Sequence, residues 1–291
     1  MSAKILDGKL LAQDLKDILK GEVAVLKTQT GFVPRLVNVM IGENHGACAY
    51  AKSQKKVAEY VGIDYELETL QEDVSKEDFS ECIKRLNGDE AVNGIMIHKP
   101  IPRHIEYNDV AQYVDTDKDL EGINVTNIGK MLIGETKIIP CTPASVMEHI
   151  KSTGIDLYGK EAVIVGHSVI VGKPLSLLLL EQFATVTVCH IATSEAGRLE
   201  EHVRRADIVV VAVGRPSVIK GSWIKEGAVV IDVGINQVDD KIVGDVEFDA
   251  ACEKAAFITP VPGGVGPVTV IMLMRNGIEA FKAQMRKKGQ W

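Results

Sequence analysis

The fold is decided by one stretch of sequence, Ala162-Val-Ile-Val-Gly-His-Ser-Val-Ile-Val-Gly172. Its first four residues predict a buried strand, and residues 173–180 predict an apolar helix directly after the loop. Glycine at each end of the loop permits a tight turn, and the free N–H groups at the start of the helix can bind a phosphate. Ser168 stands at the second glycine position of the usual dinucleotide pattern, so the loop alone fits either a dinucleotide site or a structural turn.

The surrounding sequence predicts a parallel sheet. Runs rich in valine and isoleucine, at residues 162–165, 185–189, 208–213 and 229–233, alternate with helical stretches, which indicates a sheet covered on both faces. Three loops, 213–216, 232–236 and 260–267, lie at or after strand ends, where such sheets bind ligands. The run Gly263-Gly-Val-Gly266 fits either a tight connection or a backbone that approaches a ring or a phosphate.

The first half of the chain predicts a second α/β lobe. The expected elements are helix 10–26, strand 36–41, helix 47–61 ending at Gly62, strand 65–70, helix 77–86 and strand 94–98. Residues 99–139 predict long loops around one short helix, and such loops are often functional. Thr142-Pro143 predicts the start of a helix to about residue 153, where we place the domain boundary. We expect the last helix, 268–287, to pack on the first lobe.

The composition restricts the class of protein. The 291 residues are 46% hydrophobic with a formal net charge of −7, which argues against nucleic acid as a partner. The start of the chain lacks the apolar region of a signal peptide, and no apolar run approaches membrane-spanning length. We therefore expect a cytoplasmic protein without a membrane partner. The five cysteines show no C-x-x-C spacing and are expected to be reduced.

Motifs for metal and nucleophilic catalysis are absent from the sequence. The seven histidines show neither H-E-x-x-H nor paired-ligand spacing, so no metal site is predicted. Glu148-His149 is interpreted as a solvated helix face. Ser168 does not stand in G-x-S-x-G.

Several blocks along the chain share the order and spacing of a known enzyme family. They are Tyr50 with its helix, Pro140-Cys-Thr-Pro143, Gly166-x-Ser-x-Ile-Val-Gly-x-Pro174, Asp232-Val-Gly-Ile-Asn236, Gly244-Asp-Val246 and Pro260-Val-Pro-Gly-Gly-Val-Gly-Pro-Val-Thr269. Together they resemble the methylenetetrahydrofolate dehydrogenase/cyclohydrolase family, and the resemblance covers essentially the whole chain.

The resemblance implies an α/β fold of two lobes with the active site in a cleft between them. Residues 1–141 plus 270–291 would form the folate-binding catalytic domain, and residues 142–269 a Rossmann-like dinucleotide-binding domain through which a homodimer forms. In this family a hydride passes from the methylene carbon of 5,10-methylenetetrahydrofolate to NAD or NADP. Many members then hydrolyse the methenyl cation to 10-formyltetrahydrofolate. Hydride transfer mainly needs the two rings in contact, whereas hydration needs a group that activates water.

The resemblance also assigns functional residues. The catalytic candidates are Tyr50, Gln54, His98 and Glu121. The substrate-binding candidates are Tyr50, Pro100, Asp119, Glu121, Gly263, Gly264 and Pro267. The cofactor-binding candidates are Gly166, His167, Ser168, Ile170, Val171, Gly172, His190, Gly214, Gly234, Ile235 and Thr269.

The catalytic site departs from the family pattern at three positions. The family has a lysine four residues after its tyrosine, where this chain has Gln54 after Tyr50. Residues four apart share a helix face, and a glutamine cannot exchange a proton near neutral pH. His98 replaces a glutamine, and Glu121 replaces the pterin-binding aspartate but keeps its carboxylate. We therefore expect a dehydrogenase whose cyclohydrolase activity is lost or weak; the alternative interpretation of Gln54 is a neutral surface substitution.

Two positions bear on the choice of cofactor. Family members that bind a 2′-phosphate carry an arginine after the first glycine and a serine at the end of the second strand, where this chain has His167 and Ile191. Loss of a bidentate phosphate partner and of a hydroxyl favours NAD over NADP. The usual acidic ribose partner is also missing, while His190, Thr193, Ser194 and Arg198 are nearby and His167 could still contact a phosphate.

Three alternative functions stay open. The first is a bifunctional dehydrogenase/cyclohydrolase with a substitute base such as His98 or Lys56. The second is a folate- or nucleotide-binding homologue without catalysis, although Tyr50 and Asp119 are retained. The third is a dehydrogenase for a modified pterin carrier, suggested by Glu121 and Lys99.

Overall fold

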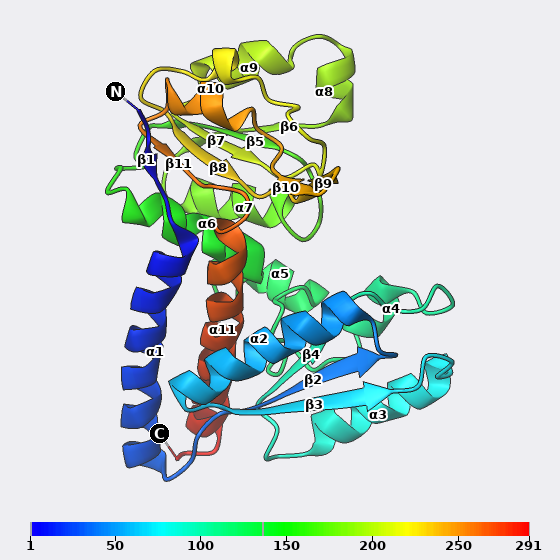
Figure 1. Ribbon diagram of the computed structural model, residues 1–291. Helices are drawn as coiled ribbons and strands as arrows, with labels where there is room; N and C mark the ends of the chain where they lie inside the picture. Colours follow the sequence, from blue (N-terminus) through cyan, green and yellow to red (C-terminus); the bar gives the residue numbers. More distant parts are fainter. Residues whose placement is uncertain (1, 136, 291) are drawn as a thin grey trace. The chain divides into compact units, whose positions relative to one another are not determined.

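The computed structural model describes residues 2–135 and 137–290, which form two compact units (Figure 1). The six-stranded unit contains residues 2–13 and 142–269, and the three-stranded unit contains residues 14–141 and 270–290. The unit boundaries fall within three helices, α1 (Gly8–Thr30), α6 (Cys141–Ser152) and α11 (Val265–Lys287). Within the described residues, we find no helix with the length and apolar character needed to span a membrane.

The six-stranded unit is built on a parallel sheet with the order β1-β11-β8-β7-β5-β6. Its strands are β1 (Lys4–Ile5), β5 (Glu161–Val165), β6 (Thr185–Cys189), β7 (Ile208–Val211), β8 (Val229–Asp232) and β11 (Phe257–Ile258). The valines and isoleucines of β7 are fully buried, as expected for a strand covered on both faces. Figure 1 shows α6 and α7 (Gly172–Glu181) on one face, and α9 (Leu199–Arg205) with α10 (Phe248–Cys252) on the other. The predicted parallel, Rossmann-like sheet is confirmed.

Two strands of this sheet were not expected from the sequence. β1 pairs in parallel with β11, with Lys4 opposite Phe257, and this pairing places residues 2–13 in the six-stranded unit. The domain assignment from the sequence had put these residues in the folate-binding lobe. Strands of two residues are too short to show a hydrophobic period. The same reason explains why the hairpin β9 (Asn236–Val238) and β10 (Lys241–Val243) was missed.

The three-stranded unit is a parallel sheet with the order β3-β2-β4. Its strands are β2 (Arg35–Ile41), β3 (Asp64–Leu70) and β4 (Gly94–Ile97), and its helices include α2 (His45–Val61) and α3 (Lys76–Gly88). On one face Phe79 and Ile83 of α3 are fully buried against Val37 and Val39 of β2. On the other face α11 packs closely, because a Cβ on Gly277 would lie 2.7 Å from the Leu36 side chain.

Local capping fixes the bounds of α2. The Asn44 side chain accepts a hydrogen bond from the backbone N–H of Ala47, 3.1 Å away, and Gly62 ends the helix in a left-handed conformation with φ of 90°. The predicted stop at Gly62 is confirmed. Between β4 and α6 the expected single short helix is instead two, α4 (Tyr107–Ala111) and α5 (Val125–Leu132). Helices this short carry too few apolar positions to be separated by periodicity.

Candidate functional site

The loop after β5 is shaped by its two glycines. Gly166 has φ of 123°, and a Cβ there would lie 2.4 Å from the carbonyl oxygen of Ala212. A Cβ on Gly172 would lie 2.0 Å from the carbonyl oxygen of Gly166. Ser168 occupies the second glycine position, and its hydroxyl accepts a hydrogen bond from the Val171 N–H at 3.1 Å. The loop therefore has the close backbone turn that a dinucleotide-binding loop requires.

A cavity of about 320 Å³ opens beside this loop, at the carboxyl ends of β5, β6 and β7. Its lining residues are Val165, Gly166, His167, Ser168, His190, Ile191, Ser194, Leu199, Ala212, Val213, Arg215 and Val218. The structure thus brings four predicted cofactor residues together, Gly166, His167, Ser168 and His190. The other predicted cofactor residues lie outside this lining: Ile170, Val171, Gly172, Gly214, Gly234, Ile235 and Thr269. Sequence reasoning missed Arg215, although its position after a strand end was a usable signal.

Two buried aspartates organise the loops at the same edge of the sheet. The Asp245 carboxylate accepts hydrogen bonds from the backbone N–H groups of Val213, Gly214 and Arg215, at 2.8–2.9 Å. Asp232 accepts from the N–H groups of Gly234 and of Asp245 itself, at 2.9 and 3.0 Å.

The position of the Asp245 carboxylate explains why residue 234 is a glycine. A Cβ on Gly234 would lie 2.1 Å from the Asp245 carboxyl carbon, so no side chain fits there. Burial raises the pKa of Asp232 to about 6. Both carboxylates therefore hold the loops at residues 213–215 and 232–234 in place, a role that the sequence had not indicated for Asp245.

The glycine-rich loop before α11 makes close contacts within the six-stranded unit. The Gly8 N–H donates to the Gly263 carbonyl at 2.9 Å, and a Cβ on Gly264 would lie 2.6 Å from the Pro260 carbonyl oxygen. These contacts show why glycines are needed in this tight connection. The predicted substrate contacts of Gly263, Gly264 and Pro267 remain predictions. On α6, the interpretation of Glu148-His149 as a solvated face is wrong for the histidine, because His149 is fully buried.

In the three-stranded unit, Gln54 lies at the centre of a buried polar network. Its side chain is 0% exposed, so the interpretation as a neutral surface substitution is wrong. Its carbonyl oxygen accepts hydrogen bonds from the Asn38 amide at 2.6 Å and from the Tyr65 hydroxyl at 2.9 Å. Its amide donates to the sulfur of Met96 at 3.4 Å. Asn38 and Tyr65 were not expected from the sequence, and together they hold the Gln54 carboxamide in one orientation.

Tyr50 and His98 pack against each other, as the sequence predicted for one site. Their rings meet edge to face, with centroids 5.5 Å apart. Burial raises the pKa of Tyr50 to about 12, while a hydrogen bond from Gln54 opposes this shift. The phenol is therefore protonated at neutral pH. His98 is 3% exposed and its Nδ1 lies 3.0 Å from the Lys99 carbonyl oxygen, whereas its Nε2 has no partner among the described residues.

Glu121 is joined to two residues that the sequence did not connect with it. The Tyr107 hydroxyl donates to the Glu121 carboxylate at 2.7 Å, and the Lys99 ammonium lies 3.6 Å from the centre of the Tyr107 ring. Burial raises the pKa of Glu121 to about 7, and the hydrogen bond from Tyr107 and the charge of Lys99 oppose the shift. Burial likewise lowers the pKa of Lys99. The carboxyl group is thus poised to change its charge near neutral pH.

The Asp119 side chain is held by the loop that carries Glu121. Its carboxylate accepts hydrogen bonds from the N–H groups of Glu121, Gly122 and Asn124 and from the Asn127 amide, at 2.9–3.1 Å. The side chain is 4% exposed. Four donors use the acceptor positions of a carboxylate, so Asp119 shapes the loop that carries Glu121, and its predicted contact with substrate remains a prediction.

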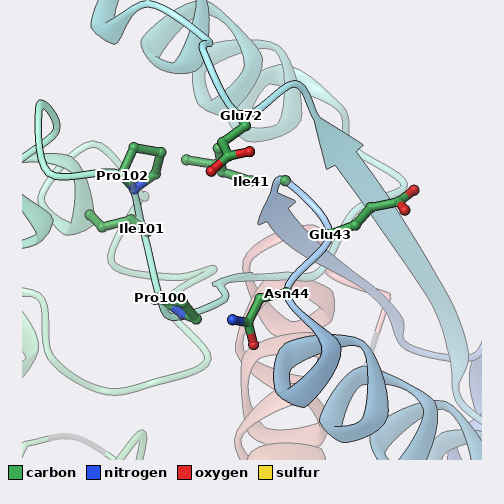
Figure 2. A pocket seen from close by; sticks show the side chains of 8 residues that line it. Ile41, Glu43, Asn44, Glu72, Pro100, Ile101 and Pro102 are labelled. Atoms are coloured by element: carbon green, nitrogen blue, oxygen red, sulfur yellow. The ribbon is translucent and has the colours of Figure 1, made fainter.

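A second cavity, of about 290 Å³, lies beyond the carboxyl ends of β2 and β3 (Figure 2). Its lining is Ile41, Gly42, Glu43, Asn44, Glu72, Pro100, Ile101 and Pro102. Pro100 is the predicted substrate residue that lines it; Tyr50, Gln54, His98 and Glu121 do not. In Figure 2 the Glu43 side chain points away from the two prolines.

Two family models match the chain. Residues 6–121 match the catalytic domain of tetrahydrofolate dehydrogenase/cyclohydrolase, and residues 140–285 match its NAD(P)-binding domain. The chain is 47% identical over 289 residues to the bifunctional protein FolD of Acetivibrio thermocellus, which covers 99% of this chain and 100% of the relative. The second match confirms the predicted nicotinamide cofactor at the level of NAD(P).

Solved structures of similar proteins match nearly the whole chain. The FolD methylenetetrahydrofolate dehydrogenase-cyclohydrolase of Trypanosoma brucei, complexed with NADP cofactor and inhibitor, has a TM-score of 0.92 and 38% identity, covering 98% of this chain and 99% of that chain. The NAD-dependent 5,10-methylenetetrahydrofolate dehydrogenase of Saccharomyces cerevisiae has a TM-score of 0.81 and 25% identity, covering 99% and 100%. The chain therefore belongs to the tetrahydrofolate dehydrogenase/cyclohydrolase family.

Proposed function

We propose that this enzyme oxidises 5,10-methylenetetrahydrofolate to the 5,10-methenyl form by hydride transfer to NAD, and that its cyclohydrolase activity is lost or weak. The observation that carries the proposal is the buried Gln54, held by Asn38 and Tyr65 beside the family's tyrosine. An amide cannot take up or release a proton near neutral pH. Hydration of the methenyl cation needs such a proton exchange, whereas hydride transfer does not.

The residues of the three-stranded unit have distinct roles in this proposal. The Glu121 carboxylate binds the amino and ring N–H groups of the pterin, because an ionised carboxylate accepts two such bonds at once. Tyr50 remains protonated, since its pKa is about 12, and offers a ring face and a hydroxyl donor to the substrate. Asn38, Tyr65 and Asp119 are positioning residues, which act through Gln54 and Glu121.

The cavity beside Gly166 suits the dinucleotide. The backbone approach at Gly166 and Gly172 leaves no room for a Cβ, and Arg215 supplies a permanent positive charge in the lining. When bound there, the nicotinamide cofactor accepts the hydride together with its electron pair. Ile191 lines the same cavity without a hydroxyl donor, and His167 stands in place of an arginine, which supports NAD as the preferred cofactor.

One spectrophotometric assay tests the dehydrogenase and its cofactor. With 5,10-methylenetetrahydrofolate at about pH 8, we expect reduction of NAD with a kcat/KM about tenfold or more above that for NADP, since a charge-assisted hydrogen bond to the 2′-phosphate is worth that much. Absence of reduction with either cofactor would establish a binding protein without catalysis. Reduction only with a different pterin carrier would favour the modified-carrier alternative.

A bifunctional enzyme is the second candidate, and one feature of His98 favours it. If Nδ1 donates to the Lys99 carbonyl, the buried Nε2 keeps a lone pair that could accept a proton. If the purified enzyme hydrates the methenyl substrate efficiently, replacing His98 by glutamine distinguishes the two candidate bases, His98 and Lys56. Loss of hydration in His98→Gln would assign the proton transfer to His98, and its persistence would turn attention to Lys56.

We also propose a homodimer joined through the six-stranded unit. Within the described residues β6 is an edge strand, and Tyr158 and Phe183 beside it are each 72% exposed with ring centroids 5.7 Å apart. An exposed strand edge next to an apolar patch favours pairing with a second copy. Sedimentation should give twice the chain mass, and Phe183→Asp should shift the enzyme toward monomer. A monomeric wild-type enzyme would contradict the proposal.

A further inference from the structure

A cation and a phenol lie next to the carboxylate of Glu121 in the three-stranded unit. Lys99 follows β4, Tyr107 begins α4, and Glu121 lies in the loop before α5. The Tyr107 hydroxyl donates to Oε2 of Glu121 at 2.7 Å, and the Lys99 Nζ lies 3.6 Å from the centre of the Tyr107 ring. The three side chains therefore form one connected row from ammonium to phenol to carboxylate.

The hydrogen bond from Tyr107 restricts the Glu121 side chain. A glutamate has one more rotatable bond than the aspartate that the family has at this position, so its carboxylate needs a partner to keep one direction. Tyr107 is that partner and contacts one oxygen, Oε2. A carboxylate has about four acceptor positions on its two oxygens. Acceptor positions therefore remain for the donors of a substrate while Tyr107 is bound.

The ammonium of Lys99 acts on this hydrogen bond through the aromatic ring. A cation over the face of a phenol is attracted by the ring electrons, and groups in such a row polarise one another. The Tyr107 hydroxyl thereby becomes a stronger donor to Glu121. Burial raises the pKa of Glu121 to about 7, and the two largest influences that oppose burial are the Tyr107 hydrogen bond and the Lys99 charge.

Other titratable or charged residues around Glu121 come from α2, β4, α6, α11 and its own loop: Tyr50, His98, Cys141, Arg275 and Asp119. Burial raises the pKa of Tyr50 to about 12 and also raises the pKa of Cys141, so both groups are neutral near pH 7. After burial, the charge of Asp119 also raises the pKa of Glu121. Tyr107 and Lys99 are therefore the side chains that offset the burial of this carboxylate.

We propose that Lys99 and Tyr107 are positioning residues that act in series: Lys99 polarises Tyr107, and Tyr107 holds the Glu121 carboxylate ionised and in one direction for the pterin. The inference rests on the proposed dehydrogenase function and deepens it. An ionised carboxylate accepts two N–H donors at once, whereas a protonated carboxyl group exchanges an acceptor position for a donor. Loss of either positioning residue therefore weakens substrate binding most at the pH where Glu121 becomes protonated.

The first measurement is the pH profile of kcat/KM with 5,10-methylenetetrahydrofolate and NAD. Lys99 and Tyr107 oppose the effect of burial on the pKa of Glu121, so Lys99→Met and Tyr107→Phe should each move the rising limb about one pH unit higher. From a limb at about pH 7, this shift lowers kcat/KM about five- to tenfold at about pH 6.5 and less than about twofold at about pH 9. KM should carry the change, with kcat near the wild-type value.

Three further variants assign the effect. Lys99→Arg should restore the wild-type profile, because a guanidinium keeps the charge and stacks on an aromatic ring. Lys84→Met removes an exposed lysine of α3 that pairs with Glu81, and it should leave the profile unaltered. In the double variant Glu121→Gln/Lys99→Met the pH-dependent loss should vanish, since no carboxylate is left to hold. This last result would assign the effect to Glu121 and not to His98.

NMR of the glutamate carboxyl carbons, in isotope-labelled enzyme without substrate or cofactor, follows Glu121 directly. Its signal is the one that disappears in Glu121→Gln. The midpoint of its titration should rise by about one pH unit in Lys99→Met and in Tyr107→Phe, and it should keep the wild-type value in Lys84→Met.

Unchanged midpoints in both variants would overturn the inference and leave the dehydrogenase proposal standing. An equal loss of kcat/KM at every pH would overturn it as well, because Lys99 and Tyr107 would then be structural residues. A shift in Tyr107→Phe alone would exclude Lys99 as a positioning residue. Absence of NAD reduction by the wild-type enzyme would overturn the proposed function, while the NMR midpoints would still decide whether the two residues act on Glu121.

Discussion

Replacing Gln54 by lysine is expected to lower the free energy of unfolding by about 2–4 kcal/mol, because two buried donors lose their acceptor. The Gln54 oxygen accepts hydrogen bonds from Asn38 and Tyr65, and an ammonium group can accept neither. The ammonium would also be buried, since the Gln54 side chain is 0% exposed. Although the substitution recreates the family's residue, we expect no recovery of methenyl hydration, because the surroundings fit an amide.

Urea unfolding of the Gln54→Lys variant measures the stability change, and methenyl decay measures hydration. Ser53→Lys is the matched control, because it adds a lysine at the preceding, exposed position of α2 and should change stability by no more than about 0.5 kcal/mol. An undiminished unfolding midpoint in Gln54→Lys, together with efficient hydration, would show that Asn38 and Tyr65 do not define the site.

Replacing Glu121 by glutamine is expected to lower kcat/KM for 5,10-methylenetetrahydrofolate by about 10- to 100-fold, the value of charge-assisted hydrogen bonds to the pterin. The wild-type kcat/KM should rise with pH through about 7, because burial raises the pKa of Glu121 to about 7 and the ionised form accepts the pterin donors. The glutamine variant keeps an acceptor for Tyr107 but has no charge to lose, so this step should disappear from its profile.

The stability of the same variant separates binding from a structural role. A carboxyl group whose folded pKa lies above its unfolded value destabilises the folded state as the pH rises through the folded pKa. Glu121→Gln should therefore unfold at a higher urea concentration than the wild type at about pH 8, while Glu59→Gln, an exposed position on α2, should change neither property. Lower stability with an unaltered pH profile would make Glu121 a structural residue.

The features that local sequence carries were predicted well. Continuous valine and isoleucine runs gave the parallel strands, and the glycines at 166 and 172 marked a loop in which no Cβ fits. The helix stop at Gly62 follows from a left-handed conformation that glycine adopts without strain. Each of these features depends on residues close together in the chain.

The features that depend on distant residues were not predicted. The hydrogen bond from Tyr107 to Glu121 joins residues of a loop region that shows no periodicity. The hydrogen bonds from the backbone of residues 213–215 to Asp245 join residues that are about thirty positions apart. In the sequence, Asn38 lies in a run that is typical of a buried apolar strand. Its hydrogen bond to Gln54 forms only in the folded chain. The sequence also could not show that four protein donors contact the Asp119 carboxylate.

The rate of methenyltetrahydrofolate decay, with and without the purified enzyme, tests the central claim most directly. General acid–base catalysis contributes about 10²- to 10⁴-fold, so an enzyme with Gln54 in place of a titratable group should hydrate the methenyl substrate at least about 100-fold more slowly than it oxidises the methylene substrate with NAD. The spontaneous decay measured without enzyme is subtracted. Enzyme-dependent hydration at a rate comparable to NAD reduction would contradict the account.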